Sequence, residues 1–289
     1  MTKRTQSFLT ISLIYIFAVG VGILTFFLLD FSLLVNVFFA DIAATLVIWI
    51  FSLVLKNASL YDPYWSVIPP VIIILMMIYL KTNVTLGVFL MITSISLWSI
   101  RLTYNWARNW HGFHEVDWRY LKIREKAPKL YPITNLFGIQ LMPTSIVFLQ
   151  MILAIKILQA EPFVNGGLVI GALVIASAAI IQYIADQQMM TFRTLNPDKN
   201  KVIDFGLWKF SRHPNYFGEI AVWWGLYLMY LSTYRVIDIF ILSPILMTCL
   251  FLFISIPLME KKILATRPSY MDYQKKVSML IPFFHKKEK

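Results

Sequence analysis

Long apolar runs separated by short polar stretches divide the chain into eight segments. A helix needs roughly 20 apolar residues to cross a bilayer, and most of these runs approach or exceed that length. The third run is short and contains Pro69-Pro70, so we expect it to be tilted or broken, which would lower the number of spans to seven. The pattern predicts an all-α transmembrane bundle with seven or eight spans. These lie at about 8–29, 32–55, 65–80, 84–100, 134–158, 166–185, 219–234 and 236–258.

Composition agrees with this pattern. Of the 289 residues, 58% are hydrophobic and 14% are charged, whereas soluble domains have about 25% charged residues. The first apolar run is too long for a signal-peptide core of roughly 7–15 residues, so we interpret it as a transmembrane helix. The single cysteine, Cys249, cannot form an internal disulfide. No linker, repeat or low-complexity stretch is evident, and we expect one transmembrane domain over residues 1–289.

The basic residues predict the orientation. If the N-terminus is inside, the inner segments contain all 26 Lys and Arg residues except Lys81, Lys156 and Arg235. Such an excess of basic residues is typical of cytoplasmic loops and places both termini in the cytoplasm. The net charge of +11 is therefore explained by topology and an anionic inner leaflet, and we expect no nucleic-acid partner. The inner segments are 1–7, 56–64, 101–133, 186–218 and 259–289.

Three of these inner segments are dense in polar and aromatic residues. In the first, Arg101, Asn105 and Arg108 fall on one helical face at i, i+4 and i+7. Guanidinium groups bind phosphate oxygens in bidentate fashion, so this face could hold a phosphate group. The alternative is an ordinary basic helix end that contacts lipid headgroups.

The second segment runs from Asp186 into the motif Arg-His-Pro-Asn-Tyr-Phe-Gly-Glu at residues 212–219, which leads directly into an apolar run. Polar groups at that depth are costly and usually belong to a site. Arg193 and Arg212 would suit phosphates. A ribose or amide would contact Asp186, Asn196 and Asn215. Alternatively, Asp186 and Arg193 only stabilise a helix end, and His213 is a turn residue.

The third segment, 260–283, is predicted to form an amphipathic helix with its basic face at the membrane surface. Tyr270 and Tyr273 would lie on one side of it. Two acids also lie near the membrane interior. Asp41 needs a partner or a protonated state. Asp62 is either a proton-holding group or an N-cap followed by Pro63.

Common ligand-binding motifs are missing from the sequence. There is no Gly-x-Gly-x-x-Gly after a strand and no phosphate-binding loop with Lys-Ser/Thr. Gly167 and Gly171 lie in an apolar run at a spacing that suits close helix packing. The histidines lack zinc-ligand spacing, so we expect no metal.

The motif at 212–219 resembles that of the DUF1295 group, bacterial membrane proteins related to steroid 5α-reductases, and the similarity covers about residues 180–285. It implies NADPH as the cofactor. The resemblance implies that Asp186 and Arg193 contact the cofactor, that Asn215 and Glu219 line its nicotinamide end, and that Tyr273 lies near it. The expected cofactor-binding residues are Arg101, Arg108, Asp186, Arg193, Arg212, His213, Asn215, Tyr216, Glu219 and Tyr273.

The N-terminal half is less similar. Asp62 falls where the relatives carry a catalytic glutamate, whereas their partner tyrosine falls near Trp98. A nearby tyrosine would then replace it as proton donor, and the predicted catalytic residues are Asp62, Tyr64 and Tyr104, with Tyr61 also close. The expected activity is reduction of an activated C=C bond in a lipophilic, steroid-like or other enone substrate, by an integral protein of the bacterial inner membrane that also contacts membrane lipids.

Two alternatives remain open. The Arg-His-Pro-x-Tyr turn also occurs in isoprenylcysteine carboxyl methyltransferases, which bind S-adenosylmethionine, so the chain could be a membrane methyltransferase. It could also be a non-catalytic bundle that binds lipid and leaves NADPH unchanged.

Overall fold

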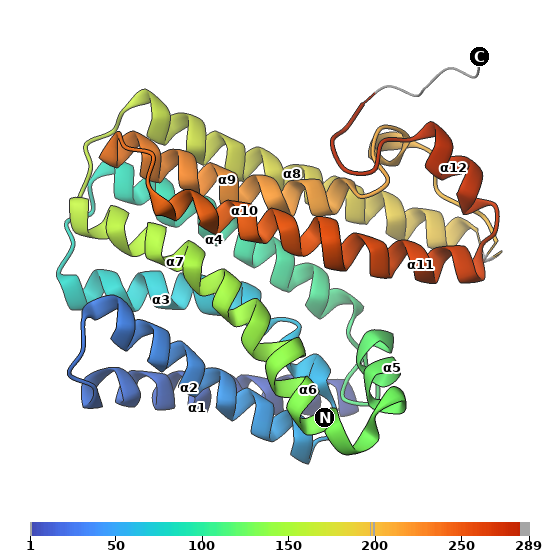
Figure 1. The fold of residues 1–289 in the computed structure, drawn as a ribbon, viewed down its shortest axis with the longest axis horizontal. Coiled ribbons are helices and arrows are strands. Elements are labelled where there is room, and N and C mark those ends of the chain that lie inside the picture. The colour runs from blue at the N-terminus through green and yellow to red at the C-terminus, as the bar shows by residue number, and fades with distance from the viewer. Residues whose placement is uncertain (1, 197, 199, 284–289) are drawn as a thin grey trace. The chain divides into compact units, whose positions relative to one another are not determined.

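The computed structural model describes residues 2–196, 198 and 200–283, and these residues form helices and no strand (Figure 1). The predicted all-α fold is confirmed. The α-helices are α1 Lys3–Leu28, α2 Leu33–Val54, α3 Tyr64–Leu80, α4 Leu86–Asn109, α5 Trp118–Lys126, α6 Tyr131–Thr134, α7 Met142–Ala160, α8 Gly166–Leu195, α9 Pro214–Tyr234, α10 Leu242–Cys249, α11 Ile256–Thr266 and α12 Tyr270–Lys276. Short π-helical segments, Asn135–Leu141 and Leu250–Ser255, precede α7 and α11.

Seven helical stretches among the described residues are long and apolar enough to cross a membrane. They correspond to the predicted spans except 219–234. That segment lies in α9, whose first turns carry the polar residues Asn215 and Glu219. The chain is therefore a membrane protein by the length and composition of its helices. The seven stretches are Lys3–Leu28, Leu33–Val54, Ala58–Leu80, Leu86–Asn109, Pro128–Ala160, Gly166–Leu195 and Ile239–Thr266.

The third span is not broken. Helix α3 continues through Pro69 and Pro70, although each proline lacks the N–H that would close a helical hydrogen bond. Both lie in the second turn, and the 3₁₀ turn Ala58–Tyr61 precedes the helix. That turn lengthens the span beyond the predicted start at residue 65.

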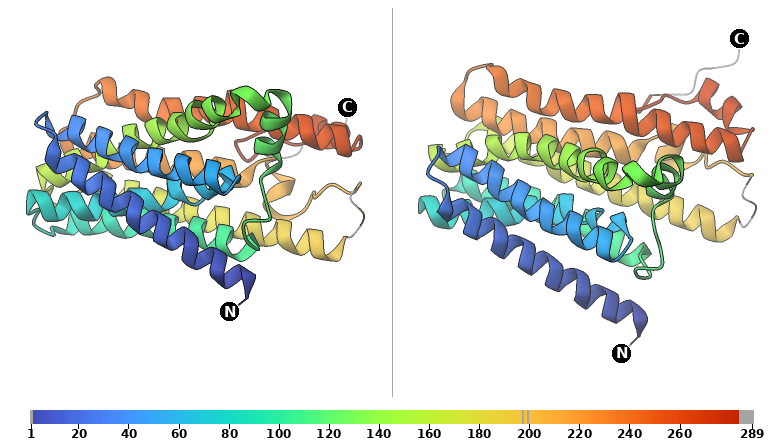
Figure 2. Two further views of the ribbon diagram at one scale, coloured as in Figure 1. Left: turned by 90° about the horizontal axis from the view of Figure 1, so that it is seen from below. Right: turned by 60° about the horizontal axis from the view of Figure 1, so that its bottom comes forward.

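The helices group into two compact units. One contains Met1–Leu75 and Leu102–Ile152, and the other contains Met76–Arg101 and Leu153–Lys289. In the first unit α1 and α2 run side by side, and in the second α8 and α9 do so (Figure 2). This division of the contacts does not decide between one domain and two, so the single domain stays a prediction.

Glycines set the close packing of α8 on α9. A Cβ atom on Gly171 would lie 2.4 Å from Met229 Cγ, and one on Gly225 would lie 2.7 Å from Ile175 Cγ1. A Cβ atom on Gly167 would lie 2.4 Å from Ser232 Cβ. The predicted role of Gly167 and Gly171 in helix packing is confirmed, since small residues let helix backbones approach closely.

The orientation in the membrane stays a prediction. Three of the predicted inner segments, 1–7, 186–218 and 259–289, extend outside the described residues at 1, 197, 199 and 284–289.

Candidate functional site

A buried hydrogen-bond cluster forms where α8 and α9 meet in the second unit. The Glu219 side chain is 3% exposed. Its Oε2 accepts hydrogen bonds from Gln182 Nε2 at 2.6 Å and from Trp98 Nε1 at 3.0 Å. Gln182 Nε2 also donates to the backbone carbonyl of Asn215 at 3.2 Å. Trp98 of α4 and Gln182 of α8 therefore hold the carboxylate of α9.

Two acceptor oxygens of this cluster are left over. Among the described residues, neither Gln182 Oε1 nor Glu219 Oε1 has a hydrogen-bond donor, although both are fully buried. The Trp223 indole lies close to Glu219, but its Nε1 reaches no acceptor in hydrogen-bond geometry. An unsatisfied buried acceptor costs about 1–3 kcal/mol. Both oxygens could therefore accept from an N–H donor of a ligand.

An ion pair lies one turn further along α8. Arg101 on α4 pairs with Asp186, and the two side chains are 8% and 15% exposed. Asp186 follows Gln182 at i+4, so the two side chains share a stripe of α8. Arg193 lies two turns further on the same stripe and is exposed. Arg267, between α11 and α12, lies near enough to repel it.

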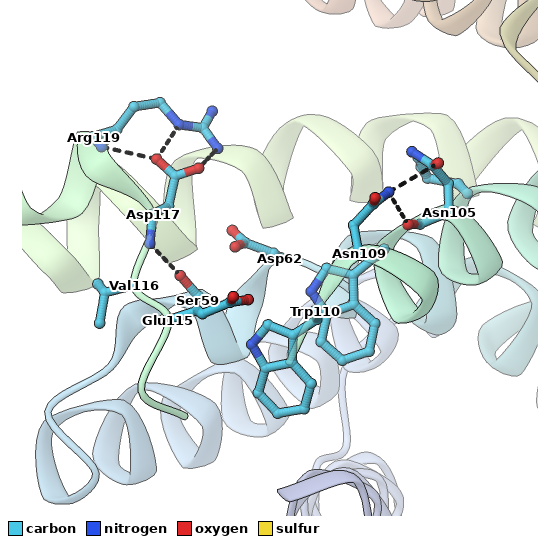
Figure 3. Close-up of a pocket in the computed structure, with 11 residues that line it drawn as sticks. Ser59, Asp62, Asn105, Asn109, Trp110, Glu115, Val116, Asp117 and Arg119 are labelled. Carbon is cyan, nitrogen blue, oxygen red and sulfur yellow. Dashed lines mark hydrogen bonds and ion pairs between the residues drawn. The ribbon is translucent and has the colours of Figure 1, made fainter. Parts of the chain in front are cut away.

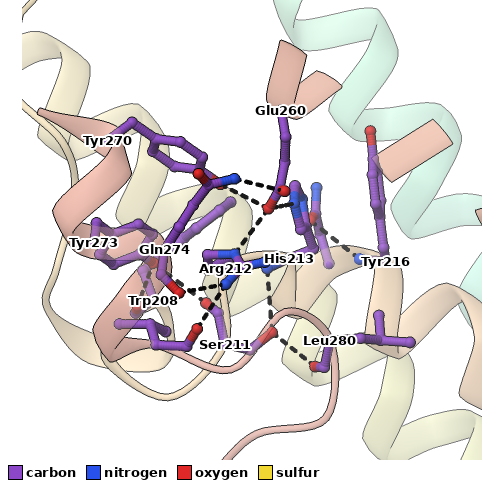
Figure 4. Close-up of polar contacts among 12 residues, drawn as sticks. Trp208, Ser211, Arg212, His213, Tyr216, Glu260, Tyr270, Tyr273, Gln274 and Leu280 are labelled. Carbon is purple, nitrogen blue, oxygen red and sulfur yellow. Dashed lines mark hydrogen bonds and ion pairs between the residues drawn. The ribbon is translucent and has the colours of Figure 1, made fainter. Parts of the chain in front are cut away.

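Arg212 and His213 are engaged in an internal network centred on Glu260 (Figure 4). Arg212 Nε donates to Glu260 Oε1 at 2.8 Å, and His213 Nε2 lies 3.1 Å from the same oxygen. Arg212 Nη1 donates to the carbonyls of Gln274 and Val277 at 2.8 and 2.9 Å. This network fastens the C-terminal segment to the Arg-His-Pro turn, so both residues first of all stabilise the fold.

Three tyrosines lie around the same network. Tyr216 stacks on His213 with 5.3 Å between ring centroids. Tyr273 donates to the carbonyl of Trp208 at 2.5 Å. Burial raises the pKa of Tyr273 well above its ordinary value, and burial followed by the charge of Glu260 does the same for the pKa of Tyr270. Both phenols therefore stay protonated donors. The predicted pairing of these two tyrosines is confirmed, but the single helix predicted over 260–283 is wrong, because α11 ends at Thr266 and α12 begins at Tyr270.

The first unit contains an open cavity of about 400 Å³ beside Asp62 (Figure 3). Asp62 Oδ1 accepts a hydrogen bond of 2.6 Å from the hydroxyl of Tyr120 on α5. Burial, and then the charge of Asp62, raise the pKa of Tyr120 well above its ordinary value, so this phenol remains a donor. The lining residues are Ser59, Asp62, Leu102, Asn105, Trp106, Asn109, Trp110, Glu115, Val116, Asp117 and Arg119.

The helix-cap alternative for Asp62 finds no support in these contacts. Its side chain accepts from the Tyr120 hydroxyl and also interacts with Ser59. Among the described residues, it makes no hydrogen bond with the N–H of Tyr64 or Trp65, the first N–H groups of α3.

The predicted tyrosines make other contacts. The Tyr64 hydroxyl donates to Asp41 Oδ1 at 3.1 Å. Tyr104 is 54% exposed and lies under the guanidinium of Arg108. Arg108 donates to Asn105 Oδ1 at 3.1 Å, which keeps the two polar groups of the predicted phosphate-binding face together.

Sequence reasoning missed three residues that complete these clusters: Tyr120, Gln182 and Glu260. Each is separated from its partner by more than thirty residues, so no local pattern connects them. Within the described ranges, no group of three His, Cys, Asp or Glu side chains could hold a metal ion.

The fold and these clusters define a polytopic helical membrane protein with polar groups buried at its helix ends. The family model "Protein of unknown function (DUF1295)" matches residues 48–277, and the chain belongs to this family. It is similar to Uncharacterized protein C594.04c of Schizosaccharomyces pombe, with 27% identity over 209 residues, which are 63% of this chain and 60% of that protein. The chain thus spans less than two thirds of this relative. No solved structure matches it.

Proposed function

We propose that the protein is an NADPH-dependent reductase of an activated C=C bond in a lipophilic substrate within the membrane. The observation that supports this most is the pair of buried, unsatisfied oxygens of Gln182 and Glu219. A carboxamide NH₂ carries two N–H donors on one nitrogen, and the nicotinamide ring carries such a carboxamide. The residues present therefore fit this cofactor, which supplies a hydride when bound.

Charges on the same stripe of α8 suit the rest of the cofactor. Arg193 is exposed, and the repulsion between Arg193 and Arg267 would be relieved by a phosphate between them. Asp186 is held by Arg101 and would accept from a ribose hydroxyl. In this proposal Arg212, His213 and Tyr273 keep the Arg-His-Pro turn in place, and Asn215 and Tyr216 border the bound group.

Reduction of an enone also needs a proton, because the carbonyl oxygen develops negative charge. The Asp62–Tyr120 pair beside the cavity would donate the hydrogen bond and then the proton. Leu102, Val116 and Trp110 also line the cavity and would give a lipophilic substrate an apolar surface to pack against. Tyr64 and Tyr104 stay predictions for the same role.

A binding screen on detergent-purified protein tests this proposal. NADPH should raise the melting temperature, because a ligand that binds only the folded state stabilises it. The Gln182→Leu variant should lose that shift. A shift with S-adenosylmethionine and none with NADPH would favour the methyltransferase. No shift with either, together with lipid binding, would favour the non-catalytic bundle.

We also propose that the protein lies in a bacterial inner membrane with both termini in the cytoplasm. Val84 and Val164 are exposed and lie in turns predicted to be outside. Cysteines at these positions should react with an impermeant reagent in intact cells, whereas a cysteine at Asn200 should react only after permeabilisation. Labelling at Asn200 in intact cells would place the α8–α9 cluster on the wrong side for a cytoplasmic cofactor.

A further inference from the structure

Asp41 is a carboxyl group inside a membrane-spanning helix. It lies in α2, away from both ends, and is 4% exposed. Its Oδ1 accepts from the Tyr64 hydroxyl, and among the described residues its Oδ2 has no hydrogen-bond partner. An ionised carboxylate is expensive at such a position, and a single hydrogen bond offsets little of that cost. The group therefore needs a ligand that neutralises it.

A chain of buried hydroxyls starts at this carboxyl group. The Thr45 hydroxyl interacts with the Tyr64 oxygen and lies 3.1 Å from Thr144 Oγ1. Thr144 Oγ1 in turn lies 2.8 Å from the Tyr61 hydroxyl. All of these side chains are buried. They come from α2, from α7 and from the segment that leads into α3, so the chain depends on the packing of the first unit.

Three hydrogen bonds run along these groups: from Tyr64 to Asp41, between Thr45 and Thr144, and between Thr144 and Tyr61. The Thr45 hydroxyl lies beside the Tyr64 oxygen and completes the row. In each hydroxyl–hydroxyl pair either oxygen can be the donor, so the row can carry a proton in either direction.

We propose that Asp41 is an intramembrane proton-binding site and that the four hydroxyls are its proton path to Tyr61, next to Asp62. In the loaded state Asp41 holds a proton and donates to the Tyr64 oxygen in place of accepting from it. On release, Asp41 gives its proton to Tyr64, each hydroxyl passes its own proton to the next, and Tyr61 gives one to a water molecule as the acceptor. The net change is one proton lost by Asp41 and one gained by the acceptor.

No base competes for this proton inside the chain. Across the described residues, no Lys, Arg or His side chain forms a hydrogen bond or ion pair with any of the five groups. The facing titratable groups are Tyr15, which packs on Tyr64 and donates to the Leu60 carbonyl at 2.5 Å, and Asp62. The use of this proton in reduction rests on the proposed function. The binding of the proton by Asp41 does not.

Infrared spectroscopy of the full-length protein in lipid nanodiscs tests the site. The wild type at neutral pH should show the carbonyl stretch of a protonated carboxylic acid, shifted in D₂O and missing in Asp41→Asn. Asparagine keeps an acceptor for Tyr64, so we expect this variant to fold. A wild type without such a band, or a band that persists in Asp41→Asn, would overturn the proposal, and the wild-type spectrum decides even if the variant misfolds.

The path has its own test. Thr144→Val removes one hydroxyl at nearly constant volume and should slow the deuterium exchange of the Asp41 band. Thr25→Val is the matched control, because Thr25 bonds only to the Val21 carbonyl of its own helix. The proton path would be contradicted if the Asp41 band exchanged at the same rate in the wild type, Thr144→Val and Thr25→Val. If NADPH binding fails while the Asp41 band behaves as described, the proposed function fails and the proton site stands.

Discussion

Gly218 on α9 lies so close to Gln182 on α8 that a Cβ atom would be 2.4 Å from Gln182 Cγ. This contact lets the Gln182 amide reach Glu219 at 2.6 Å. The absence of a side chain on Gly218 therefore leaves space for Gln182. The close packing of α8 on α9 thus determines the position of the buried Glu219 carboxylate, which we propose as part of the cofactor site.

Gly218→Ala should damage both stability and cofactor binding. Overpacking a tight contact costs about 1–3 kcal/mol, and displacing Gln182 removes its hydrogen bond to Glu219. We expect a lower melting temperature and a smaller stabilisation by NADPH. Gly20→Ala is the control, since a Cβ atom added there would meet nothing within 4 Å and alanine favours a helix by about 0.5–1 kcal/mol. Equal behaviour of the two variants would contradict the role of Gly218.

Glu219→Gln should weaken NADPH binding without unfolding the protein. Glutamine can still accept from Trp98 and Gln182 through one oxygen, but its NH₂ replaces the second acceptor. Losing an acceptor in a buried site costs about 1–3 kcal/mol, and each 1.4 kcal/mol is about tenfold in the dissociation constant. Titration with NADPH measures this loss, with Glu125→Gln, an exposed acid, as the control. Unchanged affinity in Glu219→Gln would remove Glu219 from the site.

Asp62→Asn and Tyr120→Phe should keep cofactor binding and lose turnover, because they affect only the proton donor. Correctly placed acids contribute about 10²–10⁴-fold to rates, so we expect losses in that range for enone reduction. Tyr104→Phe distinguishes the structural partner from the sequence-predicted one. If Tyr104→Phe is inactive and Tyr120→Phe is fully active, the donor is Tyr104 and the Asp62–Tyr120 bond is structural.

Glu260→Ala should mainly destabilise the protein. It leaves the Arg212 guanidinium, 11% exposed, without its carboxylate, and breaking such a pair costs about 3–5 kcal/mol. The C-terminal segment should become sensitive to protease. Asp272→Asn breaks an exposed pair with Lys275, which is worth about 0–1 kcal/mol, and should change little. Equal stability of both variants would show that Glu260 does not fasten this segment.

The helices were predictable because apolar length and charge are local properties of the sequence. Even the tight glycine contacts of α8 followed from a local spacing. The break at Pro69-Pro70 was not confirmed, because the helix tolerates two lost hydrogen bonds in its second turn. The motif at residues 212–219 identified the segment that lies against α8 and α12.

The partners within each cluster were not predictable. The contacts of Asp62 with Tyr120 and of Arg212 with Glu260 join residues 58 and 48 positions apart. Composition and spacing indicate that polar residues must find partners in a membrane, but only packing decides which ones they find. This is also why the network that Arg212 and His213 form with Glu260 could not be predicted from the sequence.

Isotope transfer would show directly whether NADPH reduces a lipid on this protein. Purified protein in nanodiscs would be incubated with extracted membrane lipids and NADPH deuterated at the transferable position, and the lipids analysed by mass spectrometry. We expect a lipid that gains one deuterium from the cofactor and one proton from water, and we expect no such product with Glu219→Gln. A lipid that instead gains a labelled methyl group from S-adenosylmethionine, with no deuterium from NADPH, would contradict the proposed reduction.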